Sequence, residues 1–473
     1  MDGLIENKKK PIKQFVVIAI ESIACITSIL LSIFLKPVNG YKMMWAIPAF
    51  YLLCVILFKE YTKKFLVDIA VTTIHIISFV KYVVMIGVIA IIRDYNNGVL
   101  TGQTPDNQYA KKAIILLLIE IITVFLGIEV FQKVHKKNRI VNINVNVNAK
   151  KVIKYIFICV SLALAIIYWK SFIPINFILY GKFETIPIVS PVSGAIKIDF
   201  YMFKAFLLCE ALKYCFKKYE LSNNIVYAIL SILAIGIYSF LMISMSRWNI
   251  IFPLIFYFIV SKQVFKRKII ILDFIVAIVL GIALVKITYA KFSFLFVDGE
   301  RKNFLKIIEV LSSQIQEYFS GIRPVAQGIQ TAHEFKKQIT FVTFFNDFAG
   351  SVPYVSRFID QTNRINCYFN VLVKGPNQDA TQIMPMITIG YSYFGIVFSG
   401  IFTFISIFIA CKFSSKANDT NSVLQKFALI IGTFWFSMCL GFNTQIIWGN
   451  FISSIMPILL LSLLIEERNF KNE

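Results

Sequence analysis

The stretch AIILLLIEIITVFLGIEVFQ, residues 113–132, consists mainly of isoleucine, leucine, valine and phenylalanine over 20 consecutive positions. A helix of about 20 apolar residues is long enough to cross the roughly 30 Å hydrocarbon layer of a membrane. Residues 113–132 therefore predict a transmembrane helix, and similar runs on either side of it decide the fold class.

Apolar runs of this length recur along most of the chain. Of its 473 residues, 58% are hydrophobic and 15% are aromatic, and the mean hydropathy is +0.72. Soluble domains hold only about 45–50% apolar residues. We therefore expect an all-α fold, a polytopic membrane helix bundle of about 12 spans. The expected spans are residues 14–35, 41–58, 65–92, 113–132, 152–169, 198–216, 223–243, 248–262, 269–291, 385–411, 425–441 and 450–465.

The net charge of +22 is distributed between the apolar runs. Lysines gather at residues 59–64, 133–151 and 262–268, as the positive-inside rule expects of cytoplasmic loops. Alternating spans then place both termini in the cytoplasm, with an uncleaved first span. No region combines basic density with a soluble fold, so the charge does not indicate a nucleic-acid partner.

The longest segment between predicted spans is residues 292–384, which we expect on the extracytoplasmic side. The predicted organisation is a bundle of spans one to nine (1–291), this large loop, and spans ten to twelve with a cytoplasmic C-terminus (385–473). Within the loop, residues 301–320 carry apolar side chains at helical spacing. They predict an amphipathic helix that lies along the membrane or caps the bundle, and that ends at Gly321 and Pro324.

Arginine is scarce, with nine among the 48 basic residues, and six of the nine fall on the predicted outer side. A guanidinium group binds phosphate or carboxylate with two parallel hydrogen bonds and keeps its charge. The pattern predicts an anion site, and the alternative is that these arginines pair with loop carboxylates or lipid head groups. The six are Arg93, Arg247, Arg301, Arg323, Arg357 and Arg364.

Acid–base candidates lie in the same loop. Glu317 and Asp347 have aromatic sequence neighbours that are expected to desolvate a carboxylate and raise its pKa. His333 is the only histidine on the outer side. The sequence contains no DxD, HExxH, GxSxG or P-loop motif and no metal-spaced cluster of ligands. We therefore expect no metal and no cofactor.

A few charged residues fall within predicted spans, where they are costly unless paired. Lys81 and Glu120 lie at similar depth in consecutive spans, so we expect an ion pair between them, with a substrate path or proton relay as the alternative. The other intramembrane charges are Glu21, Glu210 and Asp273.

The layout resembles the bacterial oligosaccharide repeat-unit polymerases of the Wzy type, which build O-antigen and capsule and have a GT-C-like architecture. The matching residues are the Tyr-Phe-Ser-Gly stretch at 318–321, the turn Ser246-Arg247, the segment PMITIGYSYFGIVFSG at 385–400, and an arginine and a glycine with ten residues between them, Arg364 and Gly375.

The resemblance implies an enzyme of the bacterial inner membrane that binds undecaprenyl-pyrophosphate-linked oligosaccharides and membrane lipid. Such an enzyme transfers the growing glycan from its pyrophosphate lipid to a sugar hydroxyl of the next unit. A chain-length regulator and a flippase of the same pathway are the protein partners that the resemblance implies. We assign Arg247, Arg323 and Arg364 to the pyrophosphates, either Glu317 or Asp347 as base and Tyr318 to a sugar, with Arg301, Arg357 and His333 completing the substrate site.

Three other functions remain open at this stage. An O-antigen-ligase-like transferase has similar anatomy and a different acceptor. A lipid-linked oligosaccharide flippase or another secondary transporter would explain Lys81 and Glu120, although such proteins have short outer loops. A structural membrane scaffold would not need the outward arginines. The sugar, its linkage and the type of surface glycan are not encoded in a recognisable motif.

Overall fold

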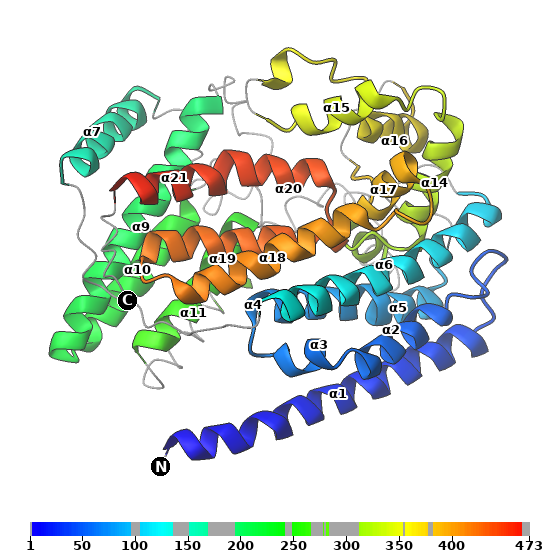
Figure 1. Ribbon diagram of the computed structural model, residues 1–473, viewed down its shortest axis with the longest axis horizontal. Coiled ribbons are helices and arrows are strands. Elements are labelled where there is room, and N and C mark those ends of the chain that lie inside the picture. Colours follow the sequence, from blue (N-terminus) through cyan, green and yellow to red (C-terminus); the bar gives the residue numbers. More distant parts are fainter. Residues whose placement is uncertain are drawn as a thin grey trace, which may run out of the picture. The chain divides into compact units, whose positions relative to one another are not determined.

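The computed structural model describes residues 2–95, 105–135, 151–168, 194–241, 248–265, 278, 281–282, 312–352, 355–376 and 382–465. Every regular element in these ranges is a helix, and none is a strand (Figure 1). The predicted all-α fold class is therefore confirmed for the part of the chain that the structure describes.

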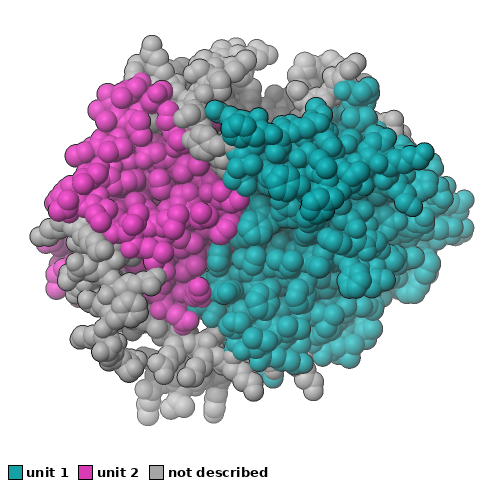
Figure 2. Space-filling view, turned by 45° about the horizontal axis from the view of Figure 1, so that its top comes forward, with its two compact units in different colours: residues 1–137, 302–415, 433–450 teal, residues 138–301, 416–432, 451–473 magenta. Residues whose placement is uncertain are grey.

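The chain divides into two compact units, coloured separately in Figure 2. Unit 1 comprises residues 1–137, 302–415 and 433–450, and unit 2 comprises residues 138–301, 416–432 and 451–473. Each unit is assembled from segments that are far apart in the sequence. The division into nine spans, an outer loop and three further spans concerns the orientation in a membrane and stays a prediction.

The helices of unit 1 come from both ends of the chain (Figure 1). Helix α1 packs against α2 and α5, and α14 packs against α6, α16 and α17. The N-terminal helices are α1 (Asp2–Phe34), α2 (Ala46–Leu57), α3 (Lys59–Lys64), α4 (Ile69–Phe79), the π-helical turn Val80–Val84, α5 (Met85–Ile92) and α6 (Asn107–Val134). The later ones are α14 (Ile322–Glu334), α15 (Phe341–Ala349), α16 (Ile365–Lys374), α17 (Met386–Phe394), α18 (Ile401–Asp419), whose last turn belongs to unit 2, and α20 (Thr444–Asn450).

In unit 2, helix α9 (Gly194–Ser222) packs against α7, α10 and α21. Lys154 of α7 forms an ion pair with Glu210 of α9. The remaining bounds are α7 (Lys151–Ile167), α10 (Ile225–Phe240), α11 (Trp248–Val264) and α21 (Met456–Ile465); α19 (Val423–Ser437) contributes residues to both units.

Five helices are long and apolar enough to cross a membrane, and four shorter apolar helices accompany them among the described residues. The five are Gln14–Phe34, Ile69–Ile92, Asn107–Val134, Val423–Leu440 and Thr444–Ile465, and each overlaps a predicted span. This confirms a helical membrane protein. The predicted span 269–291 lies almost wholly outside the described residues, and the count of twelve stays a prediction.

The expected tenth span, residues 385–411, is not one helix. Helix α17 ends at Phe394, residues 395–400 form turns, and α18 begins at Ile401. The chain folds back so closely that a Cβ atom on Gly390 would lie 2.0 Å from the carbonyl oxygen of Ser399. The prediction was wrong because hydropathy stays high through this turn and does not register a change of chain direction.

The predicted amphipathic helix at 301–320 is also corrected. Its first part, residues 301–311, lies outside the described residues, whereas 312–318 is helical. Ser313 and Gln316, which lie opposite the apolar positions in an amphipathic helix of this spacing, are buried. Pro324 does not end this helix but lies in the first turn of α14, where a missing backbone N–H costs nothing.

The expected ion pair between Lys81 and Glu120 is confirmed. Lys81 Nζ lies 2.7 Å from Glu120 Oε2, and both side chains are buried. Lys81 also donates to the carbonyl oxygen of Leu440 (2.9 Å), and the Tyr82 hydroxyl donates to Glu120 (3.0 Å). These hydrogen bonds matter because a buried ion pair is tolerated only when its remaining polar atoms are satisfied.

A second buried polar group lies nearby in unit 1. Glu21 contacts one ring nitrogen of His75, and the hydroxyl of Tyr61 contacts the other. Two of the costly charges expected in the predicted spans, Glu21 and Glu210, therefore have partners, whereas Asp273 lies outside the described residues.

Candidate functional site

Unit 1 contains two groups of polar side chains in which an arginine meets a carboxylate. The Arg323 cluster consists of Asp94, Ser313, Gln316, Glu317 and Arg323. The Asp347 cluster consists of Asp347, Arg364, Ile365, Tyr393 and Gln445. Both are built largely from residues of the predicted outer loop, and each draws a residue from a distant part of the chain.

In the Arg323 cluster the guanidinium group is fully buried at the start of α14. Its Nη1 atom donates to Asp94 Oδ1 (3.3 Å), and its Nη2 atom donates to Ser313 Oγ (3.1 Å) and lies 3.7 Å from Glu317 Oε1. Gln316 donates to Asp94 Oδ2 (3.1 Å). One arginine is thus shared by two carboxylates, and Asp94 is the more fully bonded of them.

Glu317 keeps an oxygen atom free of hydrogen bonds. Its Oε1 is buried and has no hydrogen-bond partner, as is also true of Arg323 Nε and Gln316 Oε1. Burial raises the pKa of Glu317 to about 7, opposed by the charges of Arg323 and Lys374 and reinforced by that of Asp94. A carboxyl group with a pKa near neutrality and a free oxygen can both accept and return a proton.

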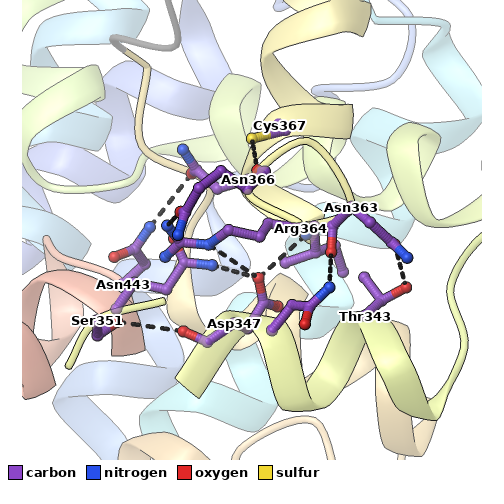
Figure 3. Close-up of polar contacts among 12 residues, drawn as sticks. Thr343, Asp347, Ser351, Asn363, Arg364, Asn366, Cys367 and Asn443 are labelled. Carbon is purple, nitrogen blue, oxygen red and sulfur yellow. Dashed lines mark hydrogen bonds and ion pairs between the residues drawn. The ribbon is translucent and has the colours of Figure 1, made fainter. Parts of the chain in front are cut away.

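The Asp347 cluster is bonded differently; Figure 3 labels its members Asp347 and Arg364. Asp347 Oδ1 accepts from the backbone N–H of Ile365 (3.1 Å) and from the side-chain amide of Gln445, and it lies 3.9 Å from Arg364 Nε. Asp347 Oδ2 accepts from the hydroxyl of Tyr393. Every oxygen of this carboxylate is therefore occupied.

Burial also raises the pKa of Asp347, to about 6, although the hydrogen bonds from Tyr393 and Ile365 and the charge of Arg364 oppose the shift. The carboxylate joins α15 to the start of α16, to the last turn of α17 and to α20. Asp347 therefore has a structural role, because its hydrogen bonds hold these four helices together. Of the two bases that the sequence left open, Glu317 has the atom available for proton transfer.

One short segment, residues 441–445, contacts Tyr318, the neighbour of Glu317, and also the Asp347 cluster. A Cβ atom on Gly441 would lie 2.4 Å from the carbonyl oxygen of Tyr318, so only glycine fits there. Asn443 donates to Asn366 Oδ1 (3.2 Å), as Figure 3 shows, and Gln445 donates to Asp347. The segment follows directly after Leu440, whose carbonyl oxygen accepts from Lys81.

A scan of protein-family models, a search of curated proteins and a search of solved structures each find no match to this chain.

The structure brings together some of the residues predicted for the site and separates others. Glu317 lies with Arg323, and Asp347 lies with Arg364. Tyr318 is half-buried beside Glu317. His333 and Arg357 are both exposed; the His333 ring contacts the hydroxyl of Tyr109 (3.2 Å), and Arg357 lies in the short 3₁₀ turn Val355–Arg357. Arg247 and Arg301 lie outside the described residues.

Arg323 and Arg364 both pair with carboxylates, which is the alternative that the sequence left open for the outer arginines. Arg323 in particular already faces two negative charges, so its first effect is to hold Glu317 and Asp94 in place. Arg364 is the more accessible of the two, and its Nε has no hydrogen-bond partner. Among the described residues, no three His, Cys, Asp or Glu side chains gather as metal ligands would.

Sequence reasoning missed Asp94, Asn443 and Gln445. Asp94 is 229 residues from Arg323, at the end of a helix whose apolar run gives no sign of such a contact. The only available signal was the position of Asp94 directly after Arg93, where an acidic residue follows a predicted span on the outer side. Asn443 and Gln445 stand in an uncharged stretch, GFNTQ at 441–445, that carries no motif.

Proposed function

We propose that this protein polymerises undecaprenyl-pyrophosphate-linked oligosaccharide repeat units for O-antigen or capsule in the bacterial inner membrane. Its support is a helical membrane protein with buried arginine–carboxylate clusters between the candidate spans. The observation that carries the proposal is Glu317, a largely buried carboxyl group with a pKa near 7 and one oxygen without a hydrogen bond.

The proposed reaction moves a glycan between two lipid-linked molecules. The acceptor hydroxyl oxygen forms a bond to the anomeric carbon of the growing glycan, and the bond from that carbon to the pyrophosphate oxygen breaks. Glu317 takes the hydroxyl proton, and the pyrophosphate leaves on its own lipid. Arg323 acts as a positioning residue, because its contacts with Asp94 and Glu317 fix the carboxyl group.

The departing pyrophosphate needs cations, which stabilise the negative charge that develops on it. Arg364 is a candidate because its side chain is partly exposed, although its Nε is buried beside Asp347 (3.9 Å) and its Nη1 donates to Gln361 Oε1 (2.7 Å). Arg247 and Arg301 are retained as candidates from the sequence. A ligase-like transferase would use the same groups with a different acceptor.

A transporter of lipid-linked oligosaccharides is the second candidate function. Its support is the buried polar groups in the candidate spans, Lys81 with Glu120 and Glu21 with His75. Intramembrane ionisable residues often mark substrate paths or proton relays. In this protein, however, both groups have partners inside unit 1, which a structural role explains equally.

The proposal is tested by deleting the gene and restoring it with variants. For a polymerase, we expect the deletion strain to carry surface glycan capped with single repeat units, and the native gene to restore the ladder of chain lengths. Glu317→Gln should fail to restore it while accumulating normally in the membrane. Glu334→Gln is the matched control, because Glu334 is exposed and bonded only within α14, and it should restore the ladder.

Other outcomes decide between the alternatives. Loss of all attached glycan in the deletion strain would indicate a ligase, and lipid-linked units trapped on the cytoplasmic side would indicate a transporter. A normal ladder with Glu317→Gln would remove this residue as the base.

A further inference from the structure

Helix α15 exposes an apolar face that the proposed reaction does not use. Phe341, Val342 and Phe345 are 80%, 56% and 55% exposed and lie on one side of the helix. Thr343 and Asp347 are buried on the opposite side. The helix is therefore amphipathic with the unusual feature that its inward face is polar and its outward face is aromatic.

This face continues into the apolar turn between α17 and α18. The ring of Phe344 lies 6.1 Å from that of Phe394, and the ring of Phe348 lies 5.7 Å from that of Phe402. The turn itself is exposed, with Val397 at 76% and its neighbours also open. The exposed large apolar residues along the turn and the start of α18 are Phe394, Ile396, Val397, Phe398, Ile401 and Ile405.

The charges near this face lie at its edges. The only charged residue within α15 is Asp347, which is buried. Lys336 and Lys337 are exposed just before the helix, and Arg357 is exposed after it, next to Phe358, which is 87% exposed. The acidic side chains Glu334 and Asp360 are exposed at the same edges, so three basic and two acidic groups lie there. An aromatic face with a basic margin is the pattern of helices that lie in the surface of a membrane containing anionic lipid.

We propose that α15 is an interfacial helix: Phe341, Val342, Phe345 and Phe358 enter the lipid surface, and the basic residues beside them contact anionic phospholipid head groups. The partner is the membrane itself, because the same apolar surface runs on into the turn before α18. The inference does not depend on the proposed enzyme activity. It places Asp347, on the other side of the same helix, close to the plane of the head groups.

The test measures the depth of α15 in a bilayer. The full chain carrying Cys159→Ser and Cys367→Ser is prepared, because the six other cysteines are buried. Val342→Cys, Phe345→Cys or Lys336→Cys is added and spin-labelled, and the protein is placed in nanodiscs of phosphatidylcholine and phosphatidylglycerol. Collision of the label with oxygen, which concentrates in lipid, is compared with collision with a water-soluble nickel complex.

We expect labels at 342 and 345 to collide preferentially with oxygen and the label at 336 to collide preferentially with nickel. Equal, nickel-dominated collision at all three positions would place α15 in water and overturn the proposal. Protection from both reagents with magnetic broadening between copies would show that a second copy of the chain covers the face, which also overturns it.

The head-group contacts are tested in discs with and without phosphatidylglycerol. We expect this lipid to increase the oxygen preference of the label at 345, and Lys336→Gln with Lys337→Gln to abolish the increase. Lys217→Gln with Lys218→Gln is the matched control, an adjacent pair in unit 2 at the end of α9, and should leave the increase intact. An increase that survives the loss of Lys336 and Lys337 would remove the electrostatic part of the proposal.

Discussion

Glu317 and Asp347 show how two buried carboxyl groups acquire different roles from their hydrogen bonds. Burial is the largest cause of the raised pKa in both. Both carboxylate oxygens of Asp347 accept hydrogen bonds from donors on three other helices. Glu317 retains Oε1 without a hydrogen bond, with the Nη2 atom of Arg323 3.7 Å away. We therefore expect substitutions at the two positions to have different consequences.

Asp347→Ala should destabilise the protein more than Glu317→Ala. Removing Asp347 leaves the N–H of Ile365 and the side chains of Tyr393 and Gln445 without their acceptor, and each unsatisfied buried group costs about 1–3 kcal/mol. Thermal midpoints of the two variants in the same detergent, measured by intrinsic fluorescence, check this. An equal fall of the thermal midpoint in both variants would show that Asp347 does not hold the helices together.

The pH dependence of stability should contain a contribution from Glu317. The folded protein holds its proton up to a pKa of about 7, above the ordinary value of 4.5 for a glutamic acid. The folded state thus binds more protons than the unfolded state between these values, and stability falls as the pH rises. The stabilising contribution is complete below about pH 4.5 and is lost by about pH 7.

We expect the free energy of unfolding to fall between pH 5 and pH 7 by more in the native protein than in Glu317→Gln, on the order of 1.4 kcal/mol per unit of pKa shift. The thermal midpoint, which is the quantity measured, should fall with it. Asp347 contributes a similar fall that ends near pH 6, and the Gln variant at 317 retains it. Parallel curves for the native protein and the variant would mean that Glu317 has an ordinary pKa.

At the scale of elements, the helices could be predicted and their interruptions could not. Apolar runs identify a helix such as α6 because burial in lipid requires an uninterrupted apolar segment about as long as the bilayer is thick. The turn at 395–400 and the bend after Leu440 depend on close contacts with other segments, at Gly390 and Gly441. A single sequence shows the glycine but not the atom that requires it.

The bend after Leu440 should depend on Lys81. Lys81→Met removes the donor to the Leu440 carbonyl oxygen and leaves Glu120 without its counter-ion, which in a buried pair costs about 3–5 kcal/mol. Cys439, buried beside Leu440, is a natural reporter of this bend, and the buried Cys411 in α18 is its internal control.

Site-resolved alkylation with N-ethylmaleimide should show Cys439 reacting at least tenfold faster in Lys81→Met while Cys411 stays protected. Lys154→Met breaks an ion pair in unit 2 and should leave Cys439 unreactive. Uniform exposure of both thiols in Lys81→Met would indicate general unfolding, and no exposure of either would show that the bend holds without the lysine.

At the scale of the whole molecule, the candidate site was only half predictable. The acidic and basic residues of the outer loop stood out by their type, and the structure does bring Glu317 to Arg323 and Asp347 to Arg364. The partners Asp94 and Gln445 come from segments outside the loop, and nothing short of tertiary structure reveals them. Unit 1 is discontinuous, so its site is discontinuous as well.

The orientation of the loop in the membrane is tested through Cys367. This thiol is half-buried in α16, and burial raises its pKa, so we expect slow but measurable labelling by a membrane-impermeant maleimide in intact cells. In a Cys159→Ser background, which removes the other cysteine that is not buried, Cys367→Ser should abolish the signal. Labelling that requires opening of the cells would place the loop in the cytoplasm and reverse the predicted topology.

The contacts of Lys81 also impose an order on biosynthesis. Leu440 follows Lys81 by 359 residues, so the ribosome delivers the carbonyl partner long after the ammonium group. Glu120, in contrast, is synthesised in the next long apolar helix, so Lys81 and Glu120 can pass through the translocon as an ion pair. A nascent chain that stops before Leu440 therefore leaves the ammonium group of Lys81 one acceptor short.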